Sequence, residues 1–231
     1  MREIILDTET TGIDPSEGHR IVEIGCVELI NRIPTGRTWH CYLNPERDMP
    51  QKAYEVHGLS EDFLRDKPLF AERADDLLAF VEGGMLVMHN AGFDFRFLNA
   101  ELERLPRSLL HWEHIIDTLA LARRRHPGAP ASLDALCRRY GVDLTERETS
   151  GHGALLDCRL LASVYVELVG GNQARLEFAT NGAQAGVLQA QAPTVRTRPA
   201  PLGPRVSTAE TEAHRAFVET LGGDALWRRY D

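Results

Sequence analysis

The stretch "LDTETTG", residues 6–12, places two acidic side chains at the end of an apolar segment. The residues before it, "REII", are typical of a buried strand, so Asp7 and Glu9 would project from one face of that strand. Two like charges about 6 Å apart repel each other by roughly 3 kcal/mol at an effective dielectric constant of about 20. This pair is therefore costly unless a positive charge compensates it.

The composition is that of an ordinary globular protein. The chain has 231 residues, of which 43% are hydrophobic and 26% are charged, enough for one sizeable domain and an appendage. No apolar run approaches a membrane span, and the N-terminus has no cleavage-site pattern. We therefore expect a cytoplasmic protein with no membrane partner.

The net charge of −8 argues weakly against a nonspecific binder of polyanions, which is normally basic. That argument fails if the acidic groups are gathered to hold cations. The four cysteines are widely spaced and form no Cys-x-x-Cys pair, so we expect reduced, mostly buried thiols.

The order of predicted elements favours a mixed α/β sheet. Three strands open the chain, and a turn at residues 34–36 is expected to join the second to the third. Strands then alternate with helices. The strands are predicted at residues 3–6, 20–31, 36–44, 85–90 and 113–118, and the helices at residues 69–83, from near Asp94, from a Ser132 cap, and at residues 154–171.

Composition divides the chain into three parts. Residues 1–171 hold the α/β pattern and are expected to form one domain. Residues 172–206 are rich in Ala, Gln, Gly and Pro and lack periodicity, which predicts a flexible linker. Residues 207–231 begin with a capping-box pattern and continue as a short amphipathic helix. Such a helix is marginal alone, so we expect it to dock on another surface.

Two more acids occupy unusual positions. Asp94 follows an apolar strand at a helix start, and Asp157 lies within an apolar helical stretch, five residues after His152. Each has an ordinary explanation alone: a strand-end surface acid, a helix cap or a surface histidine. Together they form an oxygen-rich set that suits Mg²⁺ or Mn²⁺, and four carboxylates balance the charge of two such ions.

Three motifs carry a resemblance to a known superfamily. "DTETTG", "HNAGFDFRFL" and "HGALLD" resemble the exonuclease motifs of the DEDD 3′→5′ exonucleases, in that order. Histidine five residues before the last aspartate is the mark of the DEDDh branch. The resemblance implies a ribonuclease-H-like fold with a five-stranded mixed sheet flanked by helices.

The resemblance also implies roles for individual residues. Asp7, Glu9, Asp94 and Asp157 would ligate two divalent cations, Mg²⁺ or Mn²⁺, with Asp7 bridging them. His152 would be the general base, a task that an imidazole suits near neutral pH.

Substrate contacts are implied for a subset of residues. Asp7, Glu9 and Asp157 would meet the substrate at the metal site, and Thr10 and His57 would contact the terminal nucleotide. Lys52 stands where the family has an acid, five residues before His57, which puts that contact in doubt.

Longer stretches resemble the proofreading (epsilon) subunits of bacterial DNA polymerase III. The likeness runs from Arg2 to Phe178 and resumes in the last residues. It implies a DNA 3′ end as substrate and the alpha subunit of the polymerase and the beta sliding clamp as partners. Some relatives also bind a small theta-like accessory subunit, which leaves such a partner open here.

Two segments after residue 171 are candidate partner sites. "QARLEF" matches a clamp-binding pattern in which Gln173 binds at the pocket rim and Leu176 and Phe178 fill a groove; the alternative is a helix end packed on its own domain. In the tail, large apolar side chains would bind the polymerase or fold back on the catalytic domain. These side chains are Phe217, Leu221, Leu226 and Trp227.

Three functions compete. A proofreading exonuclease accounts for the motifs, the linker and the tail together. An RNA-trimming DEDDh enzyme would need neither "QARLEF" nor the tail. A structural subunit bridging clamp and polymerase would not need the intact set of acids.

Overall fold

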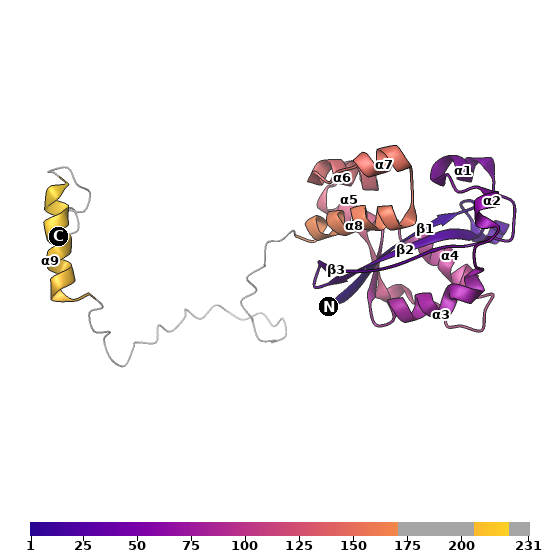
Figure 1. Ribbon diagram of the computed structural model, residues 1–231, viewed down its shortest axis with the longest axis horizontal. Coiled ribbons are helices and arrows are strands. Elements are labelled where there is room, and N and C mark those ends of the chain that lie inside the picture. The colour runs from indigo at the N-terminus through magenta and orange to yellow at the C-terminus, as the bar shows by residue number, and fades with distance from the viewer. Residues whose placement is uncertain (171–205, 222–231) are drawn as a thin grey trace, which may run out of the picture. The chain divides into compact units, whose positions relative to one another are not determined.

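The computed structural model describes residues 1–170 and 206–221 (Figure 1). The first range forms an α/β domain and the second a single helix, and they belong to separate units of the chain. None of the helices in these two ranges has the length and apolar composition that a bilayer-spanning segment requires. The expected linker and clamp motif lie outside the described residues, as do Leu226 and Trp227.

A mixed five-stranded sheet in the order β3-β2-β1-β4-β5 organises the domain, as predicted. The strands β1 (Arg2–Thr10), β2 (Ile21–Ile30) and β3 (Ile33–Tyr42) form an antiparallel meander. The strands β4 (Met85–Met88) and β5 (Ile115–Asp117) run parallel to β1 on its other side. The strand that carries Asp7 and Glu9 is thus the central one.

The turn between β2 and β3 is not where the sequence predicted it. Asn31 and Arg32 make the reversal with positive φ angles of 51° and 68°. Pro34 and Gly36, expected in the turn, lie inside β3. Proline is tolerated there because β3 is an edge strand, and the register shift in β2 between Val27 and Leu29 accommodates the irregularity.

Eight helices of the domain connect and cover these strands. The predicted Ser132 cap is confirmed, because its hydroxyl accepts a hydrogen bond from the Ala135 amide. The helices are α1 (Gln51–His57), α2 (Glu61–Leu64), α3 (Phe70–Val81), α4 (Gly92–Leu102), α5 (Thr118–Arg125), α6 (Leu133–Tyr140), α7 (Thr145–Ser150) and α8 (Ala154–Leu168). Two single 3₁₀ turns, η1 (Pro15–Glu17) and η2 (Trp112–His114), complete the domain.

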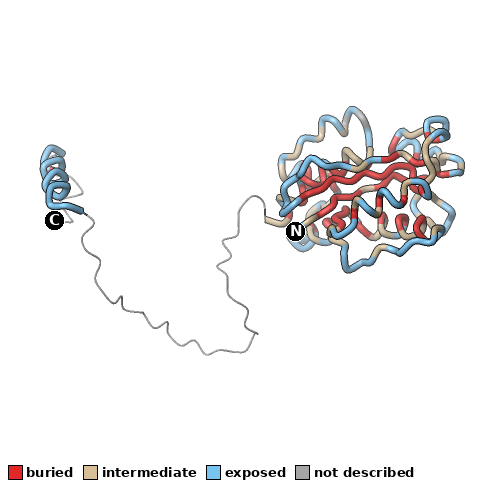
Figure 2. Tube along the Cα trace, turned by 60° about the horizontal axis from the view of Figure 1, so that its bottom comes forward, coloured by how far each residue is buried: buried red, intermediate tan, exposed pale blue. Residues whose placement is uncertain are grey.

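The sheet separates two apolar cores, and β1 contributes to both by alternation. Ile4 and Leu6 pack with α3 and α4 on one face, whereas Ile5 packs with α5, α6 and α8 on the other. Figure 2 shows a largely buried centre of the sheet, which β1, β2 and β4 form, whereas the edge strand β3 is mostly exposed. By the same alternation, Asp7 and Glu9 face the α8 side of the sheet and Thr8 faces the α4 side.

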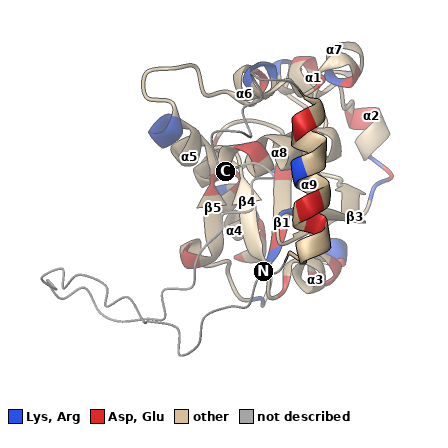
Figure 3. Cartoon of the chain, turned by 90° about the vertical axis from the view of Figure 1, so that its left-hand side faces the viewer, with Lys and Arg blue, Asp and Glu red and all other residues tan. Residues whose placement is uncertain are grey.

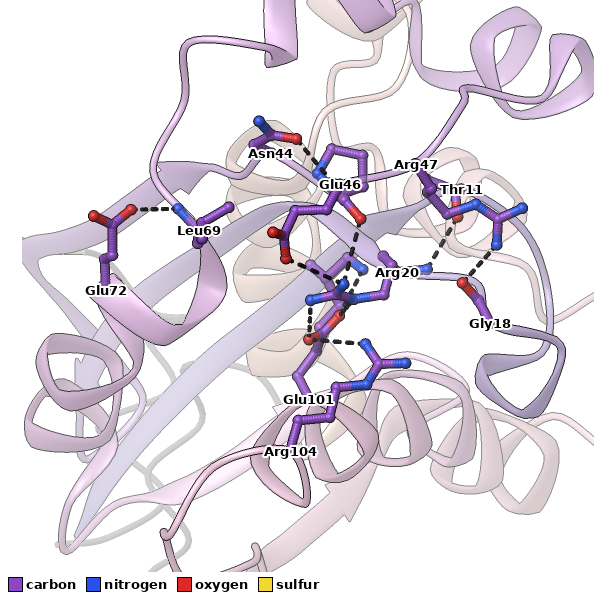
Figure 4. Close-up of polar contacts among 12 residues, drawn as sticks. Thr11, Gly18, Arg20, Asn44, Glu46, Arg47, Leu69, Glu72, Glu101 and Arg104 are labelled. Carbon is purple, nitrogen blue, oxygen red and sulfur yellow. Dashed lines mark hydrogen bonds and ion pairs between the residues drawn. The ribbon is translucent and has the colours of Figure 1, made fainter.

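A buried ion-pair network fixes α4 to the sheet (Figure 4). Glu101 of α4 is only 3% exposed and accepts two hydrogen bonds from Arg20, at 2.7 Å and 2.9 Å. Arg104 adds a third contact at 3.3 Å. The amide of Arg20 in turn donates to Thr11 Oγ1, one residue after β1. This network ties the helix that carries Asp94 to the strand end that carries Glu9.

Two contacts fix α8 along the sheet. At its N-terminus the helix presses on Gly25 of β2, where an added Cβ would lie 2.5 Å from the backbone of Ala154. Toward its C-terminus, Tyr165 donates a buried hydrogen bond of 2.8 Å to Glu3 of β1. Cys158 also donates to the Gly25 carbonyl, and all four cysteines are free and buried, as expected.

The second unit is described by α9 (Thr208–Thr220). Its predicted capping box is confirmed, because Ser207 accepts from the Glu210 amide and Glu210 accepts from the Ser207 amide. Acidic and basic residues are interspersed along this helix (Figure 3). Phe217 and Leu221 are 61% and 49% exposed, so their large apolar surfaces face outward on the described part of this unit.

Candidate active site

Asp7 and Glu9 approach the site from the C-terminal end of β1. In the register of the sheet, Asp7 lies opposite Gly25 and Glu9 lies opposite Glu23. A register shift follows Glu9, and there the pairing with β2 becomes irregular. The two carboxylates therefore share one face just where the strand ends.

Asp94 reaches the same strand end from the other face of the sheet. It lies in the first turn of α4 and is 2% exposed. Thr8, which projects to that face, donates a hydrogen bond of 2.7 Å to Asp94 Oδ1. The short connection after β4 thus delivers this carboxylate to the edge where Asp7 and Glu9 end.

Asp157 comes from the first turn of α8 and is almost fully buried. The missing side chain of Gly25 allows α8 to lie against β2, which brings Asp157 to the level of Asp7. Its Oδ2 pairs with Arg147 at 3.1 Å. Its Oδ1 is buried and has no hydrogen-bond partner among the described residues.

The electrostatics confirm that the structure brings the four carboxylates together. Burial raises the pKa of Asp7 well above its usual range, and Asp94, Glu9 and Asp157 raise it further. Burial, followed by the charge of Asp157, raises the pKa of Glu9 to about 8. Burial also raises the pKa of Asp94 to about 7. A site with this much uncompensated acidity is built to receive positive charge.

His152 lies beside the acids, in the connection between α7 and α8. Its side chain is 44% exposed, and Nδ1 lies 3.4 Å from Asp157 Oδ2. Glu9, His152 and Asp157 each offer a ligand atom within 4.8 Å of the others. The oxygen-rich donor set and the orphaned Asp157 Oδ1 fit a hard divalent cation.

His57 and Thr10 border the site. The His57 imidazole is buried, accepts a hydrogen bond from the Leu59 amide at Nδ1, and has no partner at Nε2 among the described residues. Burial lowers its pKa, and His152 is close enough to lower it further. Thr10 is buried, and its hydroxyl donates to the Gly12 carbonyl. Lys52 lies on α1 and is exposed.

Sequence reasoning missed two charged residues at this site. Glu23 of β2 faces Glu9, raises the pKa of Asp7 and Glu9, and forms an ion pair of 2.7 Å with His40. Its only sequence signal is an acid within the apolar run "RIVEIGCV". Arg147 contacts both His152 and Asp157, yet it comes from the polar stretch "TERETS", which carries no periodic signal.

The proposed clamp ligands Gln173, Leu176 and Phe178 lie outside the described residues, as do Leu226 and Trp227. They remain sequence-based predictions. Phe217 and Leu221 are the members of the tail set that the structure describes, and both lie at the C-terminal end of α9.

Comparison with known proteins places this geometry in a family. The family model described as "Exonuclease" (RNase_T) matches residues 4–165, which include all four carboxylates and His152. The chain belongs to this exonuclease family. It is a 3′→5′ exonuclease, and exonucleases of this family use divalent metal ions.

Curated relatives resemble the chain over nearly its whole length. "DNA polymerase III subunit epsilon" of Rickettsia felis is 47% identical over 224 residues, 96% of this chain and 97% of the relative. The protein of the same name from Escherichia coli is 42% identical over 240 residues, 98% of this chain and 97% of the relative. The exonuclease thus has the epsilon-subunit type of sequence throughout.

Solved structures share the fold of the domain. "Exonuclease X in complex with 5′ overhanging duplex DNA" is 28% identical with a TM-score of 0.56, covering 72% of this chain and 90% of that chain. The nuclease domain of 3′hExo, described as a DEDDh family member bound to rAMP, has a TM-score of 0.60 at 18% identity. It covers 73% of this chain and 91% of that chain, and supports the fold alone. The predicted ribonuclease-H-like fold is confirmed.

Proposed function

We propose that this exonuclease removes mispaired nucleotides from DNA 3′ ends, as the proofreading subunit of a replicative polymerase, by metal-assisted hydrolysis. The observation that carries the proposal is the convergence of four carboxylates whose pKa values are raised or whose oxygen is orphaned. Such a set is unfavourable in a purely structural role, because the fold supplies one arginine to four acids.

Asp7, Glu9, Asp94 and Asp157 are the residues that would hold two divalent cations, Mg²⁺ or Mn²⁺. When bound, such a pair supplies charge stabilisation for the attacking and leaving oxygens of a phosphoryl displacement. Asp7 lies close enough to each of the other three acids for their charges to raise its pKa, which supports its place in this ligand set. Asp7, Glu9 and Asp157 would also meet the substrate at this site.

His152 acts as the general base in this proposal. It takes the proton from the attacking water, and its partly exposed position beside Asp157 gives it access to both solvent and phosphate. Its loop lies between two helices and is flanked by Gly151 and Gly153, so the imidazole has room to adjust to a bound strand. An immobile ligand on a strand or helix would lack that freedom.

The terminal nucleotide would be held next to the metal site by Thr10 and His57. The position of the His57 ring supports this role, because it is buried against the Thr10 backbone and lies close enough to Glu23 and His152 for their charges to act on its pKa. Preference for mispaired ends needs no mismatch-reading residue, since an unpaired base is cheaper to bring into a single-strand site.

The names of the relatives support DNA at a replicating polymerase as the substrate. Both curated relatives carry the name of a DNA polymerase III subunit, and one related structure contains duplex DNA. On this basis we propose the polymerase alpha subunit as the partner of residues 207–231 and the sliding clamp as the partner of residues 173–178. The exposed Phe217 and Leu221 of α9 support the first of these assignments.

The test is digestion of labelled primers with paired or mispaired 3′ ends, in DNA and in RNA, by wild type and three variants. We expect faster removal of mispaired deoxynucleotides, loss of hydrolysis in Asp7→Ala, and sharply reduced turnover in His152→Ala. Asp66→Ala, at an exposed acid outside the site, serves as the matched control. Equal rates on paired and mispaired DNA, or a preference for RNA, would refute the proofreading assignment.

Deletion of residues 207–231 tests the partner separately. The truncated chain should retain full hydrolysis of single-stranded DNA and lose co-elution with the alpha subunit. Unchanged co-elution would mean that the catalytic domain makes the contact with the alpha subunit instead.

A further inference from the structure

The Arg147 guanidinium connects three parts of the domain. Its Nη1 donates to Asp134 of α6 at 2.6 Å. Its Nη2 lies 3.1 Å from Asp157 Oδ2 and 2.8 Å from His152 Nδ1. The side chain is 10% exposed, so these contacts are made in a largely desolvated position. One planar group thus contacts α6, α8 and the loop before α8.

The two carboxylate oxygens of Asp157 differ in their contacts. Arg147 holds Oδ2, whereas Oδ1 is buried without a partner on the described part of the chain. A guanidinium has fixed donor directions, so holding Oδ2 restricts the rotation of the Asp157 carboxylate. Oδ1 is then left without a competing donor.

The contact with His152 restrains a residue that the backbone leaves free. Glycines flank His152 on both sides, and Gly151 has a positive φ of 78°. Within the part of the chain that the structure describes, the His152 ring contacts Arg147 and Asp157. The position of the imidazole therefore depends on Arg147 and on the helix to which Asp134 anchors it.

We propose that Arg147 is a positioning residue that clamps the His152 loop over Asp157. This inference rests on the proposed roles of His152 and Asp157. Asp134 holds the Arg147 side chain against α6. Arg147 in turn fixes the positions of His152, the proposed base, and Asp157, the proposed metal ligand. Outer partners of this kind commonly change activity by about 10–100-fold when removed.

Arg147→Lys is the decisive variant, because it keeps the charge but replaces a planar fork with a single point donor. Amide hydrogen exchange across residues 145–153, measured in chelated protein, should become about 10-fold faster or more as the loop loses its restraint. On single-stranded DNA with Mn²⁺, kcat should fall about 10–100-fold while KM stays within about threefold. Asp134→Asn should act in the same direction with a smaller effect.

Arg107→Lys is the matched control. Arg107 forms a two-bond ion pair with Asp75 at 2.6 Å and 2.8 Å, on the exposed surface and outside the site. The same substitution there should change neither loop exchange nor kcat. If Arg147→Lys unfolds the domain, Asp134→Asn provides the test, since it leaves Arg147 in place.

Unchanged exchange together with wild-type kcat in Arg147→Lys would overturn the clamp. A raised KM with unchanged kcat and unchanged exchange would also overturn it, because Arg147 would then be a contact for a DNA phosphate. Faster loop exchange in a protein whose wild type fails to hydrolyse DNA would support the clamp and refute the proposed function instead.

Discussion

Two groups of buried acids in this domain differ in the positively charged partners that the fold gives them. Glu101 is paired with Arg20 through two short hydrogen bonds and touches Arg104 (Figure 4). Among the described residues, the four acids that meet near the end of β1 receive one arginine contact, to Asp157, and one hydroxyl hydrogen bond, to Asp94. The same fold that neutralises a structural acid with its own side chains leaves the site deficient in positive charge.

The pKa values show the same contrast. A hydrogen bond from Arg2 lowers the pKa of Glu28, an acid of β2 that also pairs with Arg37. Burial, followed by the charge of Asp157, raises the pKa of Glu9 to about 8. The two acids lie on adjacent strands, and they differ in that hydrogen bonds from Arg2 and Thr35 stabilise the Glu28 carboxylate, whereas burial and neighbouring acids disfavour the charged form of Glu9. The deficit at the site is therefore a local property and does not follow from the net charge of the chain.

Removal of divalent cations should have the largest effect, because it tests whether the acids at the site require added positive charge. Chelation with EDTA should reduce hydrolysis by about 1,000-fold or more, since cations at such sites are worth several kcal/mol in the transition state. Thermal unfolding followed in the same samples should show a higher midpoint with Mn²⁺ than with EDTA. Substantial hydrolysis in EDTA would mean that the acids work without metal.

Substitution of one acid from each group should give opposite changes in stability. Glu101→Ala should lower the free energy of unfolding by about 3 kcal/mol, because it removes both short hydrogen bonds of the largely buried Arg20 and leaves only the weaker contacts to Glu46 and Pro45. Asp7→Asn, measured in EDTA, should leave that free energy unchanged or raise it, because it removes one of several repelling charges. Urea denaturation checks both, and a loss of stability in both variants would remove the distinction.

Gly25→Ala tests whether α8 must lie against β2 for the site to form. The new Cβ would lie about 2.5 Å from backbone atoms of Ala154 and Leu155, so the helix must shift. Overpacking of this kind costs about 2 kcal/mol. Hydrolysis should fall more than stability does, because Asp157 moves with the helix. Gly36→Ala separates backbone strain from overpacking, because nothing lies within 4 Å of the new atom but the φ of 84° strains any side chain there. It should lower stability without lowering hydrolysis.

The last prediction concerns the dependence of stability on pH. Because the folded-state pKa values of Glu9 and Asp94 are raised to about 8 and about 7, the folded protein binds more protons than the unfolded chain between their ordinary values and these. In EDTA, stability should therefore fall as pH rises from about 4.5 to about 8, by up to roughly 1.4 kcal/mol per pH unit for each group. Urea midpoints across this range check the sign, and bound Mn²⁺ should weaken the trend.

Much of this organisation can be predicted from residues alone. The alternation in β1 predicts that Asp7 and Glu9 share a face, and the structure places them there. The apolar period predicts α3, with Phe70, Ala74, Leu77 and Val81 buried as expected and Leu78 partly buried. These features depend on local periodicity, which a single sequence records directly.

Other features depend on contacts between distant segments and leave no local signal. The turn between β2 and β3 was predicted wrongly because Pro34 and Gly36 are strong turn formers, while Asn31 and Arg32 are weaker ones. Arg147 gains its importance from Asp134 and Asp157, which approach it only in the folded domain. Glu23 likewise joins the site through the strand register.

The attachment of α8 at both ends decides which part of this domain can respond to a bound strand. Tyr165 links the helix to the start of β1, and Gly25 receives its other end, so the helix can neither slide nor lift without breaking a buried contact. A DNA strand entering the site would thus meet rigidly held acids on one side and the more adjustable segment of residues 145–153 on the other. A molecule that binds residues 145–153 would therefore act on the part of the site that these two attachments of α8 do not hold.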